Sequence, residues 1–162
     1  MKCNTDGSFI NAGIPGTAGW AVRDERGTYK GAARSIGRRI QNSLESELHA
    51  ILLAIQHCWI LGYRKLHVEG DNKKAIDILN DRLLHFSGYN WVREIKWWCK
   101  KFQDVKFTWT RRDANKVADV LAKQHFMTNC TFQYHYFIFL HVSLIFSMKI
   151  MYTHINKIQF DE

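Results

Sequence analysis

The stretch KCNTDGSFINAGIPGTAGWAVRDERGTYKGAARSI, residues 2–36, decides how the fold begins. Lys2–Phe9 has the composition of a short strand. Gly16–Asp24 and Thr28–Ile36 flank the turn residues Glu25–Gly27, an arrangement that is typical of a β-hairpin. Successive strands joined by short connections usually pair with each other in antiparallel fashion. The chain is therefore expected to start with three antiparallel strands.

Helical periodicity follows this region. Leu44–Leu61 repeats apolar residues at helical spacing, and Gly62 is placed to end the helix. The pattern further on predicts strands at Leu66–Gly70 and Val105–Arg111 and helices at Lys73–Leu84, Tyr89–Phe102 and Asn115–His125. The expected fold is α/β, with a mixed five-stranded sheet (three antiparallel strands first, then parallel strands) and helices on both faces.

The chain of 162 residues fits one domain, expected at residues 1–128, with an aromatic and aliphatic extension of unknown role at residues 129–162. Phe132–Tyr152 is long enough for a membrane span but contains Gln133, His135, His141 and Lys149. An irregular extension is favoured over a span, so a membrane partner is not expected.

The charge is unevenly distributed. The formal net charge is +8, and residues 130–162 contribute none of it because they carry two basic and two acidic side chains. A basic domain favours nucleic acid as a partner, although solubility alone can also explain the charge. The four cysteines show no zinc-binding spacing, and no signal peptide is visible. Free thiols and an intracellular location are expected, with the compartment open.

Several acidic residues lie at predicted strand ends and helix starts: Asp6, Glu45 or Glu47, Asp71 and Asp119. Each has an ordinary explanation, as a turn residue, an N-cap or a solvated helix carboxylate. Periodicity cannot choose between Glu45 and Glu47, because they flank the apolar stripe on opposite sides. Carboxylates that converge from separate segments repel each other unless a cation neutralises them, so the residues alone indicate a possible metal site.

Five ordered blocks carry a family resemblance: NTDGSF, AGWAVRDERG, NSLESELHAILLAI, LHVEGDNKKAI and RRDANKVADVLAK. Together they resemble the ribonuclease H type-1 family over roughly residues 2–126, and especially its reverse-transcriptase-like, retroelement-related branch that is abundant in plants. The resemblance implies an RNase H-like fold.

The same resemblance implies a metal-dependent hydrolase that cuts the RNA strand of an RNA–DNA hybrid. Its catalytic carboxylates match Asp6, Glu47 rather than Glu45, Asp71 and Asp119. By resemblance, these residues hold two Mg²⁺ ions, which Mn²⁺ can replace, and the products carry 5′-phosphate and 3′-hydroxyl ends. The expected enzyme is a monomer with no small-molecule cofactor. The matching substrate-binding positions are Gly7, Ser8, Asn42, Ser43, Asn72, Arg111, Arg112 and Asn115.

One part of the family pattern is missing. Many members have a histidine in the loop before the last helix, but here residues 108–119 read TWTRRDANKVAD. The missing histidine places turnover in question and leaves open a nucleic-acid-binding module that cuts poorly. A third hypothesis is an interaction or membrane-tethered protein that uses the aromatic tail.

Overall fold

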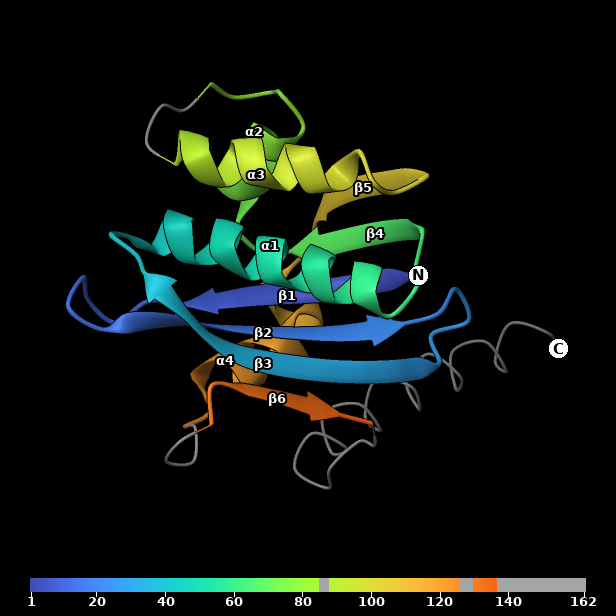
Figure 1. Cartoon of the computed structure of the whole chain (residues 1–162), viewed down its shortest axis with the longest axis horizontal. Coiled ribbons are helices and arrows are strands. Elements are labelled where there is room, and N and C mark those ends of the chain that lie inside the picture. The colour runs from blue at the N-terminus through green and yellow to red at the C-terminus, as the bar shows by residue number, and fades with distance from the viewer. Residues whose placement is uncertain (85–87, 126–129, 137–162) are drawn as a thin grey trace, which may run out of the picture.

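One mixed sheet of six strands organises the described part of the chain, residues 1–84, 88–125 and 130–136 of the computed structural model (Figure 1). Its strand order is β5-β4-β1-β2-β3-β6. The elements are β1 Lys2–Ser8, β2 Pro15–Arg23, β3 Tyr29–Arg39, α1 Ser43–Ile60, β4 Lys65–Gly70, α2 Lys73–Leu79, α3 Tyr89–Cys99, β5 Asp104–Trp109, the short 3₁₀ helix Arg112–Ala114, α4 Lys116–Lys123 and β6 Phe132–His135.

The strand directions follow the sequence prediction. β1 with β2 and β2 with β3 are antiparallel pairs, whereas β4 is parallel to both β1 and β5. In the turn between β2 and β3, the amide of Gly27 donates to the Asp24 carbonyl over 3.0 Å. Gly27 has a φ of 84°, which glycine adopts without a steric penalty. The predicted α/β class and the antiparallel start of the sheet are confirmed.

The expectation of five strands was wrong by one. β6 pairs antiparallel with the free edge of β3, where Tyr134 lies opposite Ala33. The Tyr134 ring also packs beside His57, with ring centroids 5.1 Å apart, so a four-residue run that gives a weak local signal is held by tertiary contacts. The predicted division near residue 128 stays a prediction.

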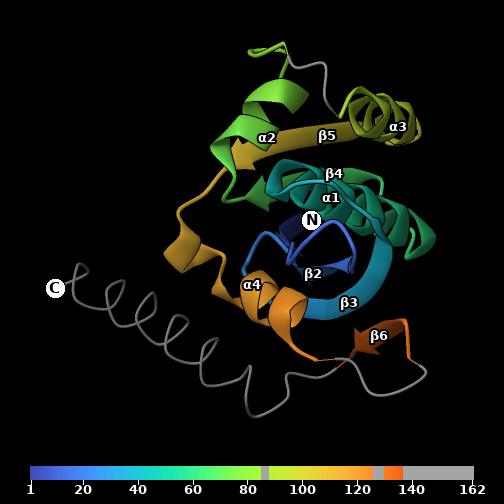
Figure 2. The same cartoon turned by 90° about the vertical axis from the view of Figure 1, so that its left-hand side faces the viewer.

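Helices cover both faces of the sheet, as predicted: α1 and α4 lie on opposite sides (Figure 2). Two glycines permit their close approach. A Cβ on Gly7 would lie 2.2 Å from the Ser46 carbonyl oxygen of α1, and one on Gly19 would lie 2.5 Å from the Ala118 carbonyl oxygen of α4. The two helices are therefore seated directly on β1 and β2, which fixes where their first turns lie.

The predicted apolar stripe of α1 forms the main core. Leu48 and Ile55 are fully buried, with Leu44, Ile51 and Leu52 beside them. Helix α2 ends earlier than predicted, at Leu79 rather than Leu84, and the chain then turns at Asp81, which has a φ of 59°. Leu84 is 90% exposed, so its apolar character was a misleading helix signal.

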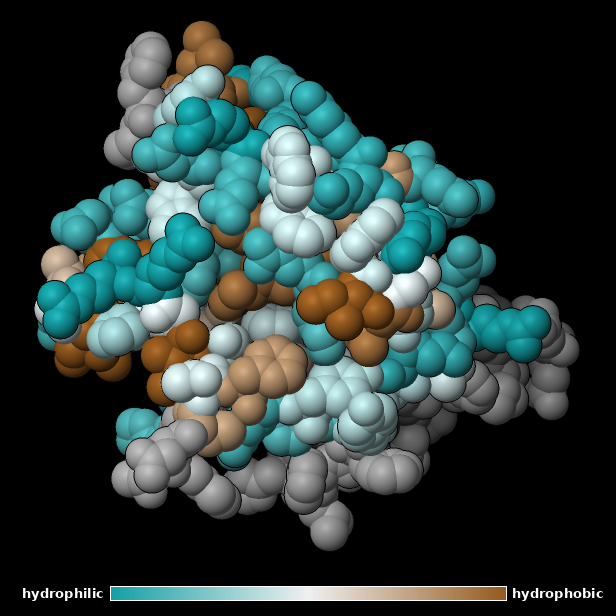
Figure 3. Space-filling model, in the orientation of Figure 1, coloured by the Kyte–Doolittle hydropathy of each residue, from teal (hydrophilic) through white to brown (hydrophobic). Residues whose placement is uncertain are grey.

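The molecular surface over α1 and α3 is mainly hydrophilic, with single apolar residues scattered across it (Figure 3). Scattered apolar side chains are normal on a soluble protein surface. Within the described residues, no helix combines the length and apolar character needed to cross a membrane. Most of the candidate span Phe132–Tyr152 lies outside the described residues.

Candidate metal centre and nucleic-acid site

Three of the four predicted carboxylates meet at one end of the sheet. β1 and β4 are parallel neighbours in which Thr5 pairs with Gly70, so the next residues, Asp6 within β1 and Asp71 just after β4, lie side by side. The first turns of α1 lie at this same end and bring in Glu47 (Figure 1). One carboxylate oxygen from each of Asp6, Glu47 and Asp71 lies within 4.8 Å of the others.

The structure distinguishes the two candidate glutamates of α1. The Glu45 carboxylate accepts a hydrogen bond from the Gln41 amide over 3.0 Å, and the Glu45 amide donates to Asn42 Oδ1 over 3.0 Å. Asn42 thus caps α1, and Glu45 holds the residue before the cap, so both contacts stabilise the start of the helix. Glu47 instead joins Asp6 and Asp71, so only Glu47 contributes to the acidic cluster.

The cluster carries unfavourable negative charge. Burial, together with the charges of Asp71 and Asp119, raises the pKa of Asp6 to about 7. Burial, together with the charges of Asp6 and Asp71, raises the pKa of Glu47 to about 9. The pKa of Asp71 is also raised, chiefly by burial, although Arg112 opposes the shift. Closely spaced carboxyls of this kind favour either protonation or a bound cation.

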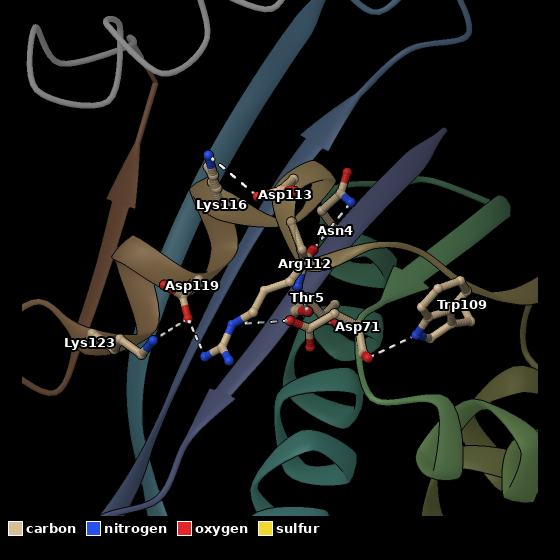
Figure 4. A network of polar contacts seen from close by, with 10 residues as sticks. Asn4, Thr5, Asp71, Trp109, Arg112, Asp113, Lys116, Asp119 and Lys123 are labelled. Atoms are coloured by element: carbon tan, nitrogen blue, oxygen red, sulfur yellow. Dashed lines mark hydrogen bonds and ion pairs between the residues drawn. The ribbon is translucent and has the colours of Figure 1, made fainter.

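Asp119 lies beside the cluster of Asp6, Glu47 and Asp71 but does not belong to it (Figure 4). Its carboxylate is paired with Lys123, one helical turn further along α4. The Arg112 side chain reaches between two of the carboxylates, with Nη2 3.6 Å from Asp119 Oδ1 and Nε 3.9 Å from Asp71 Oδ2. Arg112, whose side chain is 74% exposed, therefore places positive charge beside Asp71 and Asp119.

Family comparison agrees with this arrangement. Residues 4–125 match the family described as "Reverse transcriptase-like". The chain belongs to the reverse transcriptase-like family. A search of curated proteins found no match to this domain.

Solved structures with a similar fold include ribonucleases H. RNase H1 of the archaeon Halobacterium salinarum NRC-1 is 19% identical, with a TM-score of 0.70 over 75% of this chain and 92% of that one. The N-terminal RNase H domain of a Mycobacterium tuberculosis protein is 20% identical, with a TM-score of 0.66 over 75% and 88%. LC11-RNase H1 in complex with an RNA/DNA hybrid is 16% identical, with a TM-score of 0.66 over 74% and 91%. The reverse transcriptase-like domain therefore has an RNase H-like fold.

Two predicted substrate-binding asparagines of this domain cap helices. Asn42 Oδ1 accepts from the Glu45 amide at the start of α1, and Asn72 Oδ1 accepts from the Ala75 amide at the start of α2 over 3.1 Å. Ser43, the first residue of α1, is exposed. Both capped helices begin beside the acidic cluster, so these positions remain candidates for phosphate contacts.

The other predicted substrate-binding residues have varied surroundings. Gly7 packs under α1 and Ser8 ends β1 half-buried. Arg111 is exposed next to Arg112. Asn115 is only 1% exposed, and its side-chain amide donates to the Thr5 carbonyl, so its side chain is directed into the protein.

Two residues at the site were missed by the sequence reasoning. Lys123 follows Asp119 at a spacing of four residues, the helical spacing of an ion pair, so the pair could have been predicted. The indole Nε1 of Trp109 donates to the Asp71 carbonyl over 2.9 Å and connects the end of β5 to the loop after β4. A tryptophan in an alternating strand pattern gives no signal for this contact.

Proposed function

We propose that this reverse transcriptase-like domain hydrolyses the RNA strand of RNA–DNA hybrids with two divalent cations, Mg²⁺ or Mn²⁺, and leaves 5′-phosphate and 3′-hydroxyl ends. One observation carries the proposal: Asp6, Glu47 and Asp71 place carboxylate oxygens within 4.8 Å of each other on an RNase H-like fold. The solved complex of LC11-RNase H1 with an RNA/DNA hybrid supports the choice of partner.

The residues present fit divalent cations of this type. All the donors are carboxylate oxygens, which Mg²⁺ prefers, and burial together with carboxylate repulsion raises the pKa of Asp6 and of Glu47, which a bound divalent cation would oppose. When bound, the cations would promote ionisation of the attacking water and stabilise the charge that develops on the leaving 3′-oxygen.

Each carboxylate has a proposed task. Asp6, the most central, would contact both cations. Asp119 would share with it the cation on the side of the attacking water, and Glu47 and Asp71 would hold the cation on the side of the leaving group. For Asp119 to do so, its carboxylate must exchange its contacts with Arg112 and Lys123 for the cation.

The basic groups near the cluster supply the proposed hybrid contacts. Arg112 and Arg111 are exposed at its edge, where guanidinium groups can bind phosphate in bidentate fashion. Discrimination of RNA from DNA would rest on 2′-hydroxyl contacts and groove shape rather than on base sequence. We propose action as an intracellular monomer.

A second candidate is a nucleic-acid-binding domain that cuts poorly. The absence of histidine from residues 108–119 favours it, because that loop would otherwise contribute a proton-transfer group near the metal site.

The two candidates differ in one assay. RNA labelled at its 5′ end, annealed to DNA and incubated with purified protein and Mg²⁺, should yield fragments whose 3′ ends can be extended by a polymerase. A chelator should stop the reaction. Salt-sensitive binding of the hybrid with no cleavage in either Mg²⁺ or Mn²⁺ would support the binding domain instead.

A further inference from the structure

A buried polar network joins the sheet to the start of α4. Its members are Asn4 on β1, Glu69 on β4 and Asn115, the residue before α4, and each is at most 9% exposed. The buried residues of α4 nearby are apolar, including Ala118 and Leu121. Polar groups buried in such surroundings are tolerated when their hydrogen bonds are satisfied, so the contacts of this network indicate its purpose.

Asn115 uses both ends of its side-chain amide on β1. Its Nδ2 donates to the Thr5 carbonyl over 2.8 Å, and its Oδ1 accepts from Asn4 Nδ2 over 3.3 Å. An asparagine at a helix start usually accepts from an amide of its own first turn, but the Asn115 side chain makes no such bond. The side chain therefore attaches α4 to the sheet instead of capping the helix.

Glu69 fixes the orientation of Asn4. Its Oε2 accepts from Asn4 Nδ2 over 3.2 Å, which holds that nitrogen between Glu69 and Asn115. Glu69 is itself held by Arg23 from β2, over 2.7 Å, and by Lys2, over 3.4 Å. A carboxylate anchored by two cations is a rigid acceptor, so the chain of contacts from Glu69 to α4 has little freedom.

The network ends next to two proposed metal ligands. Thr5, whose carbonyl receives the Asn115 amide, directly precedes Asp6. The Asp119 amide donates to the Asn115 carbonyl over 3.1 Å, so Asp119 lies one helical turn from the attachment point. The hydrogen bond that attaches the Asn115 side chain to β1 therefore sets the separation between Asp6 and Asp119.

We propose that Glu69, Asn4 and Asn115 are positioning residues for the metal site: they fix α4, and with it Asp119, relative to Asp6. This inference rests on the proposed function, in which Asp6 and Asp119 share a cation. The three residues act through Asp119 and do not belong to the acidic cluster themselves.

Two substitutions of Glu69 separate positioning from bulk stability. Glu69→Leu removes the acceptor that orients Asn4, whereas Glu69→Gln keeps an oxygen there. Val68→Ala is the matched control, because Val68 is the neighbouring residue of β4, is fully buried in the core and has no side-chain hydrogen-bonding group to contribute to the network. It should weaken the fold without moving Asp119. Asn115→Ala removes the attachment directly and replaces Glu69→Leu if that variant does not fold.

The first readout is Mn²⁺ binding to the folded proteins without nucleic acid, measured by calorimetry. Glu69→Leu and Asn115→Ala should bind Mn²⁺ roughly 10- to 100-fold more weakly than wild type, the effect typical of losing a group that orients a metal ligand. Glu69→Gln should keep most of the affinity, and Val68→Ala all of it. Wild-type affinity in Glu69→Leu or Asn115→Ala, or equal losses in Glu69→Leu and Glu69→Gln, would overturn the inference.

The second readout needs no metal. Hydrogen exchange at the Asp119 amide should be faster in Glu69→Leu and Asn115→Ala than in Val68→Ala at matched stability, because the start of α4 is no longer attached. Unchanged exchange there would overturn the positioning role. If wild type binds Mn²⁺ no better than Glu47→Gln does, the proposed metal site fails, and the exchange result then decides the attachment of α4 separately.

Discussion

Replacing Glu47 with glutamine should stabilise the metal-free protein at neutral pH. In the folded state, burial and the charges of Asp6 and Asp71 raise the pKa of Glu47 to about 9, whereas its ordinary value is 4.5. At pH 7 the side chain is therefore protonated when folded and ionised when unfolded, so folding must take up a proton. Stability from this residue is greatest below the unfolded pKa and declines as the pH rises toward the folded pKa.

The size of the effect follows from these two values. Between 4.5 and pH 7 lie about 2.5 pH units, and each corresponds to about 1.4 kcal/mol, which gives an upper limit of about 3 to 4 kcal/mol. Asp6 and Asp71 share the repulsion, and a buried amide needs hydrogen bonds of its own, so we expect a net gain of about 1 to 3 kcal/mol in the free energy of unfolding.

Urea unfolding in the presence of a chelator measures this gain. Glu47→Gln should match wild type near pH 4.5, and its advantage should grow as the pH rises toward 8. Glu45→Gln is the matched control, because it lies on the same helix, keeps an acceptor for the Gln41 amide and is outside the acidic cluster, so no gain is expected. A Glu47→Gln variant that is no more stable than wild type at pH 7, or whose gain is the same at every pH, would refute the reasoning.

Two further predictions concern other parts of the molecule. Arg112→Gln should bind Mn²⁺ more tightly than wild type in calorimetry, because the cation no longer competes with the guanidinium beside Asp71 and Asp119. The same variant should bind the hybrid more weakly, with a salt dependence reduced by about one phosphate contact. An unchanged affinity for Mn²⁺ would contradict the first of these predictions. Burial and the charge of Arg38 lower the pKa of the buried His49 ring to about 4, so the ring is neutral in the folded protein at pH 7. The free energy of unfolding should therefore fall by up to about 3 kcal/mol as the pH drops from 6.5 to 4. His49→Leu should remove that part of the acid sensitivity, which thermal melts at pH 4.5 and pH 7 would measure. An equal loss of melting temperature in both proteins would contradict the second prediction.

Local patterns predicted the elements that depend on neighbouring residues. The α1 stripe from Leu44 to Ile55 and the turn at Gly27 are confirmed because helix periodicity and turn chemistry act over a few residues. The local patterns failed where contacts between distant parts of the sequence decide whether a strand or helix forms. β6 depends on the free edge of β3, and α2 ends at Leu79 while Leu84, whose apolar side chain predicted a longer helix, is 90% exposed.

The acidic site shows the same division. Local chemistry gives Asp6 an ordinary turn role and cannot separate Glu47 from Glu45; the ordered motifs were needed to select the four carboxylates. No sequence pattern indicated that Arg112 lies between Asp71 and Asp119, or that the Asn115 side chain faces Thr5. Two of these three contacts join residues that are far apart in the sequence: Arg112 follows Asp71 by 41 positions, and Asn115 follows Thr5 by 110 positions.

Comparing cleavage by wild type and Asp6→Asn is the most direct test of the proposed activity. The substitution keeps the shape of the side chain and removes the carboxylate that is 4% exposed at the centre of the cluster. With Mg²⁺, wild type should cut RNA annealed to DNA and spare single-stranded RNA and duplex DNA, whereas Asp6→Asn should bind the hybrid with similar affinity and leave it intact. Equal cleavage by the two proteins, or binding without cleavage by wild type in both Mg²⁺ and Mn²⁺, would contradict the account.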